Sequence, residues 1–263
     1  MGQLHYQYKR HLMFDTNRIL EAANYDFNGK KILITGASGG IGYATAKKLI
    51  DSGAEVFTNS RREIEIISKN HHHFCGDIAD EAILERWVSE LPSIDGVVYS
   101  AGILDTMPIR FAKKEKMMKT WDINFFAAVN LSALLIKKKK LNKNGAFVFI
   151  SSISAKHPYI GGSMYTASKA ALETYSKVLA LELKGKFIRS NCIAPAMVKT
   201  EMYEKGIEKG SLEFMEEHVA KYPFGAGESE DLAQATCFLL SDATRWINGI
   251  TLTMDGGFLL QGT

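Results

Sequence analysis

Cysteine is scarce in this chain of 263 residues, which contains only Cys75, Cys192 and Cys237. The three are far apart and odd in number, and no CxxC or Cys/His ligand spacing joins them. The sequence therefore predicts neither a disulfide framework nor a structural zinc site, and we expect no bound metal. A protein of the reducing cytoplasm fits this cysteine usage best.

Long apolar runs and a strong net charge are also missing. No segment approaches the about 18 apolar residues that a membrane helix needs. The N-terminus lacks the continuous apolar region of a signal peptide. The net charge is only +3, from 32 basic and 29 acidic side chains. We therefore expect neither a membrane nor a nucleic acid as a partner.

What the chain does contain is the composition of an ordinary globular protein, with 46% hydrophobic and 23% charged residues. No Pro-rich or Gly/Ser-rich linker divides it. We therefore expect one domain over residues 29–263, preceded by an N-terminal extension over residues 1–28. Within the extension, residues 17–23 fit a short helix, and we interpret the whole extension as a surface or subunit-contact arm.

Short apolar segments alternate with segments that carry apolar residues at helical spacing. This alternation indicates βαβ units, and hence a doubly wound α/β fold with a predominantly parallel sheet. Residues 200–228 interrupt the alternation with apolar side chains among charges, which predicts a substrate-loop insertion able to act as a lid. The predicted strands are 31–35, 54–58, 73–75, 96–100, 145–151, 188–193 and 250–253, and the predicted helices are 41–52, 80–91, 116–137, 163–183 and 231–240.

A glycine-rich turn, Thr35–Gly42, follows the first predicted strand and opens the first predicted helix. Gly36, Gly40 and Gly42 permit a tight turn, a close approach of backbone to phosphate and close helix–strand packing. The free N–H groups at the start of the helix favour an anion. A glycine triplet also occurs in purely structural turns, but the strand–turn–helix context favours a dinucleotide site.

The end of the second predicted strand indicates which dinucleotide binds. An NAD-binding fold usually has an acidic residue there for the ribose 2′-hydroxyl, whereas this chain has Asn59, Ser60, Arg61 and Arg62. Arg61 can pair with a 2′-phosphate and Ser60 can hydrogen-bond to it. The alternative is that both arginines are surface residues, which is the interpretation we give to Arg62. The sequence thus predicts NADP(H) rather than NAD(H).

Catalytic chemistry is indicated by Tyr165 and Lys169, which lie four residues apart on one face of a predicted helix. A phenol has a reference pKa of about 10, and a nearby ammonium lowers that pKa. This spacing is common by chance. It gains weight from Ser152, at the carboxyl end of the fifth predicted strand, where open α/β sheets bind ligands. Asn124, in an apolar helical segment, is either a satisfied core residue or the holder of a proton-relaying water.

With these residues the chain resembles the short-chain dehydrogenase/reductase family, especially its FabG-like 3-oxoacyl-carrier-protein reductase branch. The resemblance covers roughly residues 28–263, and the motifs occur in the family's order. They are TGASGGIG at 35–42, Asp77-Ile78, Ser100-Ala101-Gly102, Asn124, Ser152, YTASK at 165–169, Asn191–Pro195 and Met254–Gly257.

The resemblance implies a Rossmann fold and an oxidoreductase that transfers hydride between NADP(H) and a carbonyl carbon. Tyr165 would exchange a proton with the carbonyl oxygen, and Ser152 would hydrogen-bond that oxygen. Lys169 would lower the Tyr165 pKa and bind the nicotinamide ribose, and Asn124 would hold a water. From residues and resemblance together, the expected cofactor contacts are Gly36, Ser38, Gly40, Ile41, Gly42, Ser60, Arg61, Asp77 and Ile78 (at the adenine), Ser100, Ala101, Gly102, Tyr165, Lys169, and Val198 and Thr200 (at the carboxamide).

The substrate is expected to be a 3-oxoacyl thioester, free or carrier-bound, or a small ketone. Two alternatives stay open: a sugar or secondary-metabolite dehydrogenase, and an NADP-binding regulator without turnover. The family usually forms homotetramers or homodimers through its long helices, which the resemblance implies here.

Two positions depart from the family pattern. Tyr99 stands where an Asn is usual, and Ala196 where a Gly is usual, so the cofactor geometry is expected to differ locally.

Two further features invite over-interpretation. His71–His73 resembles a metal-binding tract, but we interpret it as a surface loop. Lys137–Lys140 suits the end of a helix, with an acidic carrier as a second interpretation.

Overall fold

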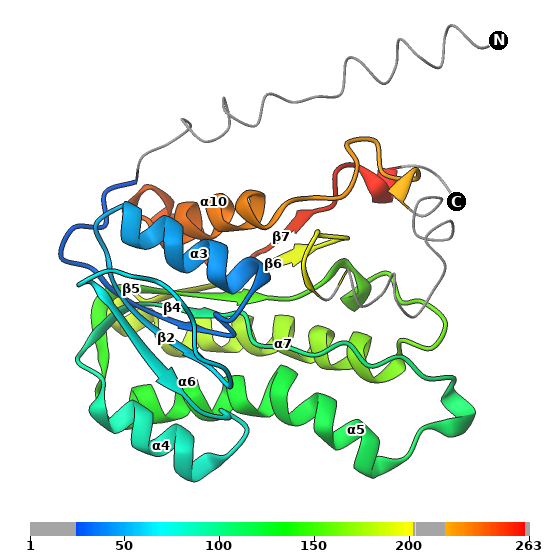
Figure 1. Cartoon of the computed structure of the whole chain (residues 1–263), viewed down its shortest axis with the longest axis horizontal. Coiled ribbons are helices and arrows are strands. Elements are labelled where there is room, and N and C mark those ends of the chain that lie inside the picture. Colours follow the sequence, from blue (N-terminus) through cyan, green and yellow to red (C-terminus); the bar gives the residue numbers. More distant parts are fainter. Residues whose placement is uncertain (1–24, 202, 204–218, 261–263) are drawn as a thin grey trace, which may run out of the picture.

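The computed structural model describes residues 25–201, 203 and 219–260 (Figure 1). The predicted helix 17–23 lies outside these residues, as do most of the predicted extension 1–28 and much of the predicted insertion 200–228. The described end of the extension already joins the domain, because Phe27 is buried and its N–H donates to the Ser52 carbonyl at 2.9 Å. None of the described helices is long and apolar enough to cross a membrane.

Seven parallel strands form one sheet in the order β3-β2-β1-β4-β5-β6-β7. The order reverses at β1, which pairs with β2 on one side and with β4 on the other, as a doubly wound fold requires. This confirms the predicted fold class. The strands are β1 (Lys31–Thr35), β2 (Glu55–Ser60), β3 (His71–Cys75), β4 (Ile94–Tyr99), β5 (Leu141–Ile150), β6 (Arg189–Pro195) and β7 (Thr251–Met254).

Helices cover both faces of the sheet (Figure 1). One face carries α3 (Gly40–Asp51) and α10 (Ser229–Leu240), and the other carries α4 (Glu81–Glu90), α6 (Ala127–Lys137) and α7 (Ser163–Glu182). A further helix, α5 (Lys114–Trp121), leads into α6 through the π-helical turn Asp122–Phe126. Short 3₁₀ turns complete the described structure at Ile109–Phe111, Ile153–Ala155, Lys184–Lys186, Asp242–Thr244 and Phe258–Leu260.

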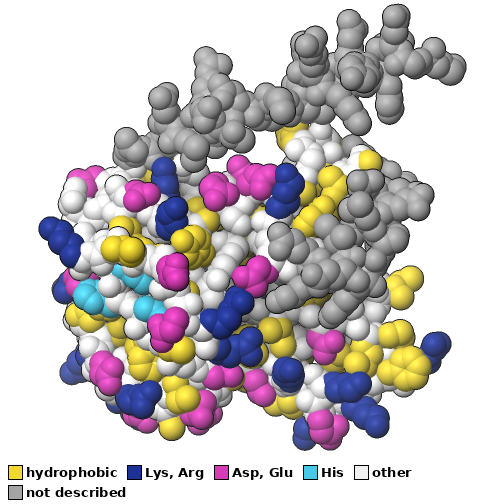
Figure 2. Space-filling model, viewed as in Figure 1, with side chains coloured by type: hydrophobic (Ala, Val, Ile, Leu, Met, Phe, Trp, Pro, Cys, Tyr) yellow, Lys and Arg dark blue, Asp and Glu magenta, His cyan; other side chains and the backbone are white. Residues whose placement is uncertain are grey.

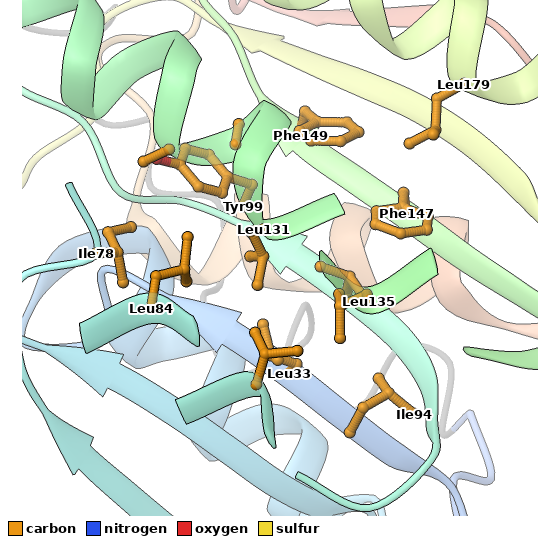
Figure 3. Close-up of a cluster of buried hydrophobic side chains, with 14 of the residues drawn as sticks. Leu33, Ile78, Leu84, Ile94, Tyr99, Leu131, Leu135, Phe147, Phe149 and Leu179 are labelled. Atoms are coloured by element: carbon orange, nitrogen blue, oxygen red, sulfur yellow. The ribbon is translucent and has the colours of Figure 1, made fainter. Parts of the chain in front are cut away.

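The core lies in two layers, one on each face of the sheet, because successive strand residues point to opposite faces. Leu33 of β1 packs in the layer under α4, α6 and α7, whereas its neighbours Ile32 and Ile34 pack in the layer under α3 and α10. Figure 3 shows the first layer, in which Phe147 and Phe149 of β5 stack at 5.9 Å between ring centroids. Strands buried on both faces explain the apolar runs in the sequence.

The histidine tract is not the predicted surface loop, because His71–His73 begin the edge strand β3 and pair with Val56–Thr58 of β2. His71 Nε2 and His73 Nδ1 lie 2.8 and 2.9 Å from the Thr58 hydroxyl, while His72 stacks on the other sheet face. Figure 2 shows histidines gathered at one edge. In the described part of the chain, no cluster of His, Cys, Asp or Glu could hold a metal ion.

The basic run Lys137–Lys140 lies where α6 ends and β5 is about to begin, at the amino edge of the sheet. Lys138 pairs with Glu85 at 3.0 Å, and the Lys140 amino group donates to the carbonyls of Ser89 and Leu91. Two of these lysines therefore bind the loop between α6 and β5 to α4 and to the residue that follows α4. Because the predicted catalytic residues follow the carboxyl ends of the strands, a carrier bound to this run would face the wrong edge.

Candidate active site

The predicted site residues converge on the carboxyl edge of the sheet, where β1, β4, β5 and β6 end. The glycine-rich turn follows β1, Ser100–Gly102 follow β4, and Ser152 follows β5. Helix α7 brings Tyr165 and Lys169 to the same edge. This is the edge at which open parallel sheets bind their ligands.

The glycine-rich turn needs its glycines for space. Gly36 has a φ of +70°, and a Cβ on it would meet the backbone of Ala101 at 2.7 Å. A Cβ on Gly42 would meet the Gly36 carbonyl at 2.4 Å. Gly40, with a φ of +51°, opens α3 and faces Thr200. The turn therefore brings bare backbone and the start of a helix to the edge, which suits a pyrophosphate.

At the end of β2 the structure brings a different arginine to this turn from the one predicted. The Arg62 guanidinium lies 3.4 Å from the Ser38 hydroxyl and pairs with Glu201 at 3.1 Å. Ser60 is buried and its hydroxyl donates to the Arg62 carbonyl, so it is already engaged. Arg61 is exposed and forms no part of this cluster. Arg62 and Ser38 therefore lie side by side at this turn.

The next two predicted contacts differ in what they offer a cofactor. Asp77 accepts a hydrogen bond from the Ala79 N–H at 3.0 Å through one carboxylate oxygen. Ile78 is 5% exposed and packs in the core cluster beside Leu84 (Figure 3). Because the Ile78 side chain belongs to the core, the predicted contact with adenine at this position would come from its backbone.

Asn124 lies in the π-helical turn and is fully buried. Its amide holds the chain after β4, because Oδ1 accepts from the Ile103 N–H at 2.8 Å and Nδ2 donates to the Ile103 carbonyl at 3.0 Å. Nδ2 also donates to the Ser168 hydroxyl at 3.1 Å. Both amide protons are thus used within the protein, and a water held at this residue would bind the backbone or the free lone pair of Oδ1.

Tyr99 explains how the chain tolerates its first departure from the family pattern. Its side chain is 1% exposed, packs against Phe149, and donates its hydroxyl proton to the Ile123 carbonyl within the π-turn. A π-turn disrupts the regular helical hydrogen bonds, so its carbonyls need other donors. Tyr99 therefore ties the end of β4 to the turn that presents Asn124.

Lys169 is 4% exposed, and its ammonium donates to the Ile150 carbonyl at 2.8 Å. A Cβ on Gly102 would lie 3.3 Å from both Lys169 Nζ and Asn124 Oδ1, so the two side chains flank the backbone after β4. Burial lowers the pKa of Lys169 from 10.5 to about 8. The side chain is therefore charged at neutral pH and titrates within reach of ordinary assay conditions.

Tyr165 and Ser152 meet one turn of α7 before Lys169. Ser154 donates both its N–H, at 3.2 Å, and its hydroxyl, at 2.9 Å, to Ser152 Oγ. Because Ser152 accepts both bonds, its own hydroxyl proton remains available to Tyr165 or to a carbonyl oxygen. Lys169 Nζ lies 5.7 Å from the centre of the Tyr165 ring.

The Tyr165 phenol differs from expectation in its acidity. Burial raises the pKa of Tyr165, while its hydrogen bond with Ser152 lowers it by a smaller amount, so the pKa is raised overall. The expected lowering by Lys169 is absent from this structure, since the ammonium points to the Ile150 carbonyl. The phenol is consequently a protonated donor at neutral pH.

The loop after β6 carries the last predicted contacts. Val198 forms a parallel bridge with Gly227, and the Lys199 N–H donates to the Gly227 carbonyl at 2.9 Å. Thr200 lies against the glycine-rich turn, because a Cβ on Gly40 would meet its methyl group at 2.9 Å. Ala196 has no positive φ, so the second departure from the family pattern carries no backbone strain.

Several site residues were missed from the sequence. Ser154 orients Ser152, Ser168 supports Asn124, Glu201 pairs with Arg62, and Glu173, which is 5% exposed, accepts from the Ser151 hydroxyl at 3.0 Å. Ser168 and Glu173 lie on the same helix as Tyr165, so helical spacing could have suggested them. Glu201 is distant in sequence from Arg62, and no local pattern predicts the pair.

Comparison with known proteins identifies the family. Residues 36–259 match a family model described as enoyl-(acyl carrier protein) reductase. The 3-oxoacyl-[acyl-carrier-protein] reductase of Rickettsia felis is 36% identical over 243 residues, which cover 89% of this chain and 99% of the relative. The chain belongs to the short-chain dehydrogenase/reductase family. It is thus an oxidoreductase of a family that uses a nicotinamide cofactor.

Relatives within this family act on varied substrates. The L-xylulose reductase of Caenorhabditis elegans is 32% identical, over 90% of this chain and 98% of the relative. Among solved structures, the aldohexose dehydrogenase of Thermoplasma acidophilum is 26% identical with a TM-score of 0.82, over 89% of this chain and 96% of that one. Family membership therefore fixes the class of reaction and leaves the substrate to be argued from the site.

Proposed function

We propose that the chain reduces a carbonyl compound to a secondary alcohol with NADPH, and that Asn124, Ser152, Tyr165 and Lys169 form its catalytic set. The observation that carries this proposal is the convergence of Ser152, Tyr165 and Lys169 at the carboxyl edge, with the Ser152 proton left free by Ser154. A regulator without turnover would need no such arrangement around a half-buried phenol.

A bound nicotinamide cofactor would supply the hydride. Tyr165 holds a proton on its hydroxyl oxygen and gives it to the carbonyl oxygen of the substrate. Ser152 donates a hydrogen bond to the same oxygen and stabilises the charge that develops there. The raised pKa of Tyr165 keeps the phenol protonated at neutral pH, which favours the donor role and hence reduction. Lys169, charged below about pH 8, would bind the ribose of the nicotinamide.

The choice of NADPH rests on the end of β2. No carboxylate follows that strand directly to repel a 2′-phosphate, and Arg62 lies beside Ser38 of the glycine-rich turn. In place of Arg61, we assign the 2′-phosphate to Arg62. The Glu201 carboxylate pairs with the Arg62 guanidinium, so a 2′-phosphate would compete with this carboxylate for the same donors.

The names of the FabG relatives favour a 3-oxoacyl thioester, free or bound to a carrier, as the substrate class. The names of the L-xylulose reductase and the aldohexose dehydrogenase make a polyhydroxylated substrate the second candidate. For assembly we propose a homodimer or homotetramer, since α7 exposes the apolar side chains of Val178 and Leu181 on one face.

Replacing Tyr165 with Phe tests the catalytic proposal. Loss of the general acid should lower kcat for ketone reduction by about 100-fold to 10,000-fold, while the dissociation constant of NADPH stays within a few fold. Tyr175→Phe is the matched control, because it makes the same change about three turns further along α7 and should retain activity. Full activity in Tyr165→Phe would overturn the catalytic assignment.

A further inference from the structure

An apolar pocket of about 420 Å³ lies between the loop after β4 and the loop after β5. Its volume falls within the range of small-molecule sites. One wall comes from the first loop and its 3₁₀ turn, the other from the second loop and the start of α7. The main lining residues are Met107, Pro108, Ile109, Tyr159, Gly161 and Thr166.

The two walls are joined to each other by the backbone. The Met107 N–H donates to the Gly161 carbonyl at 2.7 Å, and Gly161 has a φ of +85°, so its bare backbone comes close to the first loop. A side chain at this position would be strained and would lie within 3.6 Å of the Met107 nitrogen. Both loops therefore form the pocket, and the positive φ at Gly161 favours glycine where they join.

The pocket adjoins the candidate active site at the start of α7. Thr166 follows Tyr165 directly on α7, and Ser163 is two residues before it. Tyr159 lies close enough to Tyr165 for the two phenols to interact: the pKa of Tyr159 is raised to about 12, by burial first and then by Tyr165. A substrate whose carbonyl reaches Tyr165 can thus extend one of its substituents into this pocket.

The chemistry of the lining distinguishes the two candidate substrate classes. No charged side chain lines the pocket, and the Thr166 hydroxyl is directed to the Ser163 carbonyl at 3.5 Å. The hydroxyl groups of Ser163 and Tyr159 are the other polar side-chain groups of the lining. A polyhydroxylated tail would bury several hydroxyl groups here with too few partners, which is costly. An alkyl tail would leave no polar group unpaired, and its transfer out of water would be favourable in free energy.

We propose that this pocket binds an unbranched aliphatic tail of the substrate, so that the enzyme selects carbonyl compounds with an alkyl chain over sugars and other polyols. The proposal rests on the proposed reductase function of the same site. It adds a specificity pocket formed by the loops after β4 and β5, separate from the insertion at 200–228.

The test is the reduction of a series of unbranched methyl ketones of increasing length, with NADPH in excess. If the tail enters the pocket, kcat/KM should rise about fourfold with each added methylene until the pocket is full. A ketose of the same carbon number should be reduced far more slowly. A flat series, or preferred reduction of the ketose, would overturn the proposal.

Ser163→Phe provides a variant that fills the pocket from an exposed position at the start of α7. It should lower kcat/KM for long ketones far more than for the shortest, and so flatten the series. Ile67→Ser is the control, because Ile67 is fully exposed and lies outside the pocket. Its series should match that of the unaltered protein, and an unchanged slope in Ser163→Phe would contradict the location of the tail.

A binding measurement separates failure of this proposal from failure of the proposed function. Calorimetric titration of the protein with unbranched alcohols of increasing length reports the same gain per methylene without turnover. If no ketone is reduced but the dissociation constants fall about fourfold per methylene, the pocket assignment stands and the reductase proposal fails. Dissociation constants that do not depend on length would overturn the pocket assignment by themselves.

Discussion

Burial determines the pKa values of individual side chains at this site. Tyr165 and Lys169 share a helix face, as their spacing predicts, yet burial moves their pKa values in opposite directions, up for the phenol and down for the ammonium. The result is a protonated donor beside a cation that is close to titrating. Sequence spacing predicts that such side chains meet, whereas their proton affinities depend on the packing around them.

Lys169→Met should stabilise the protein at neutral pH while abolishing its proposed catalysis. The folded-state pKa of Lys169 is about 8, against 10.5 ordinarily, so the unfolded chain binds more protons between these values and stability rises with pH there. Below pH 8 the full cost of the buried charge, about 3 kcal/mol, is present. After subtracting about 1 kcal/mol for the lost hydrogen bond to Ile150, Met should gain about 2 kcal/mol.

Urea unfolding of both proteins at pH 7 and near pH 10 measures this difference. The advantage of the Met variant should shrink at the higher pH, because the lysine is then neutral in the folded state. A constant difference across this range would show that Lys169 is not destabilised by burial of its charge.

Arg62 and Arg61 form a natural pair for testing cofactor selection. Arg62→Ala should raise KM for NADPH by about 10-fold to 100-fold, since a charge-assisted hydrogen bond to phosphate is lost, and should leave KM for NADH almost unchanged. Arg61→Ala is the control, because that side chain lies outside the Ser38 cluster. If Arg61→Ala raised KM for NADPH and Arg62→Ala did not, the 2′-phosphate would instead be assigned to Arg61, as the sequence predicts.

At the scale of elements, the π-turn Asp122–Phe126 is the part of the fold on which the site most depends. It interrupts what the sequence predicts as one helix over 116–137, and thereby directs Asn124 into the protein. Helical periodicity cannot reveal a single widened turn, because one extra residue shifts the pattern too little. The structure also shows what supports the turn, namely the hydroxyl of Tyr99.

Tyr99→Phe tests this support, because it removes one hydroxyl and leaves the ring packed against Phe149. Loss of the hydrogen bond should lower the free energy of unfolding by about 1–2 kcal/mol, since the Ile123 carbonyl is left without this donor. We expect kcat to fall further in Tyr99→Phe than in the Tyr175→Phe control, because Asn124 follows Ile123 in the π-turn. Equal stability of Tyr99→Phe and the unaltered protein would show that the π-turn does not need this donor.

The whole molecule follows the sequence-based prediction closely in its sheet and less closely at its edges. The sequence predicts buried strands at 31–35 and 145–151 because their apolar runs are continuous, and β1 and β5 lie there. The edge strand β3 was placed only in part, since its histidines lack the apolar signature and form a strand by pairing with β2. Contacts between distant segments, such as Arg62 with Glu201, arise only when the chain folds.

The proposed oligomer belongs to this scale as well. Val178 and Leu181 are 44% and 69% exposed and lie three residues apart on α7, so they form one apolar face of the isolated chain. Light scattering on the purified protein should give the mass of two or four chains. A variant with lysine at both positions should move toward the monomer mass, and an unchanged mass would place the contact elsewhere.

The pairing of β1 with both β2 and β4 has a consequence for synthesis. Strand β1 lies in the middle of the sheet, but its second neighbour, β4, ends at Tyr99. Chains emerge from the ribosome at about 5–20 residues per second, so for several seconds β1 has an unpaired edge. During that interval the glycine-rich turn lacks its packing partner, the backbone of Ala101. A nascent chain stalled before residue 94 should therefore be a substrate for chaperones, and one stalled well beyond it should not.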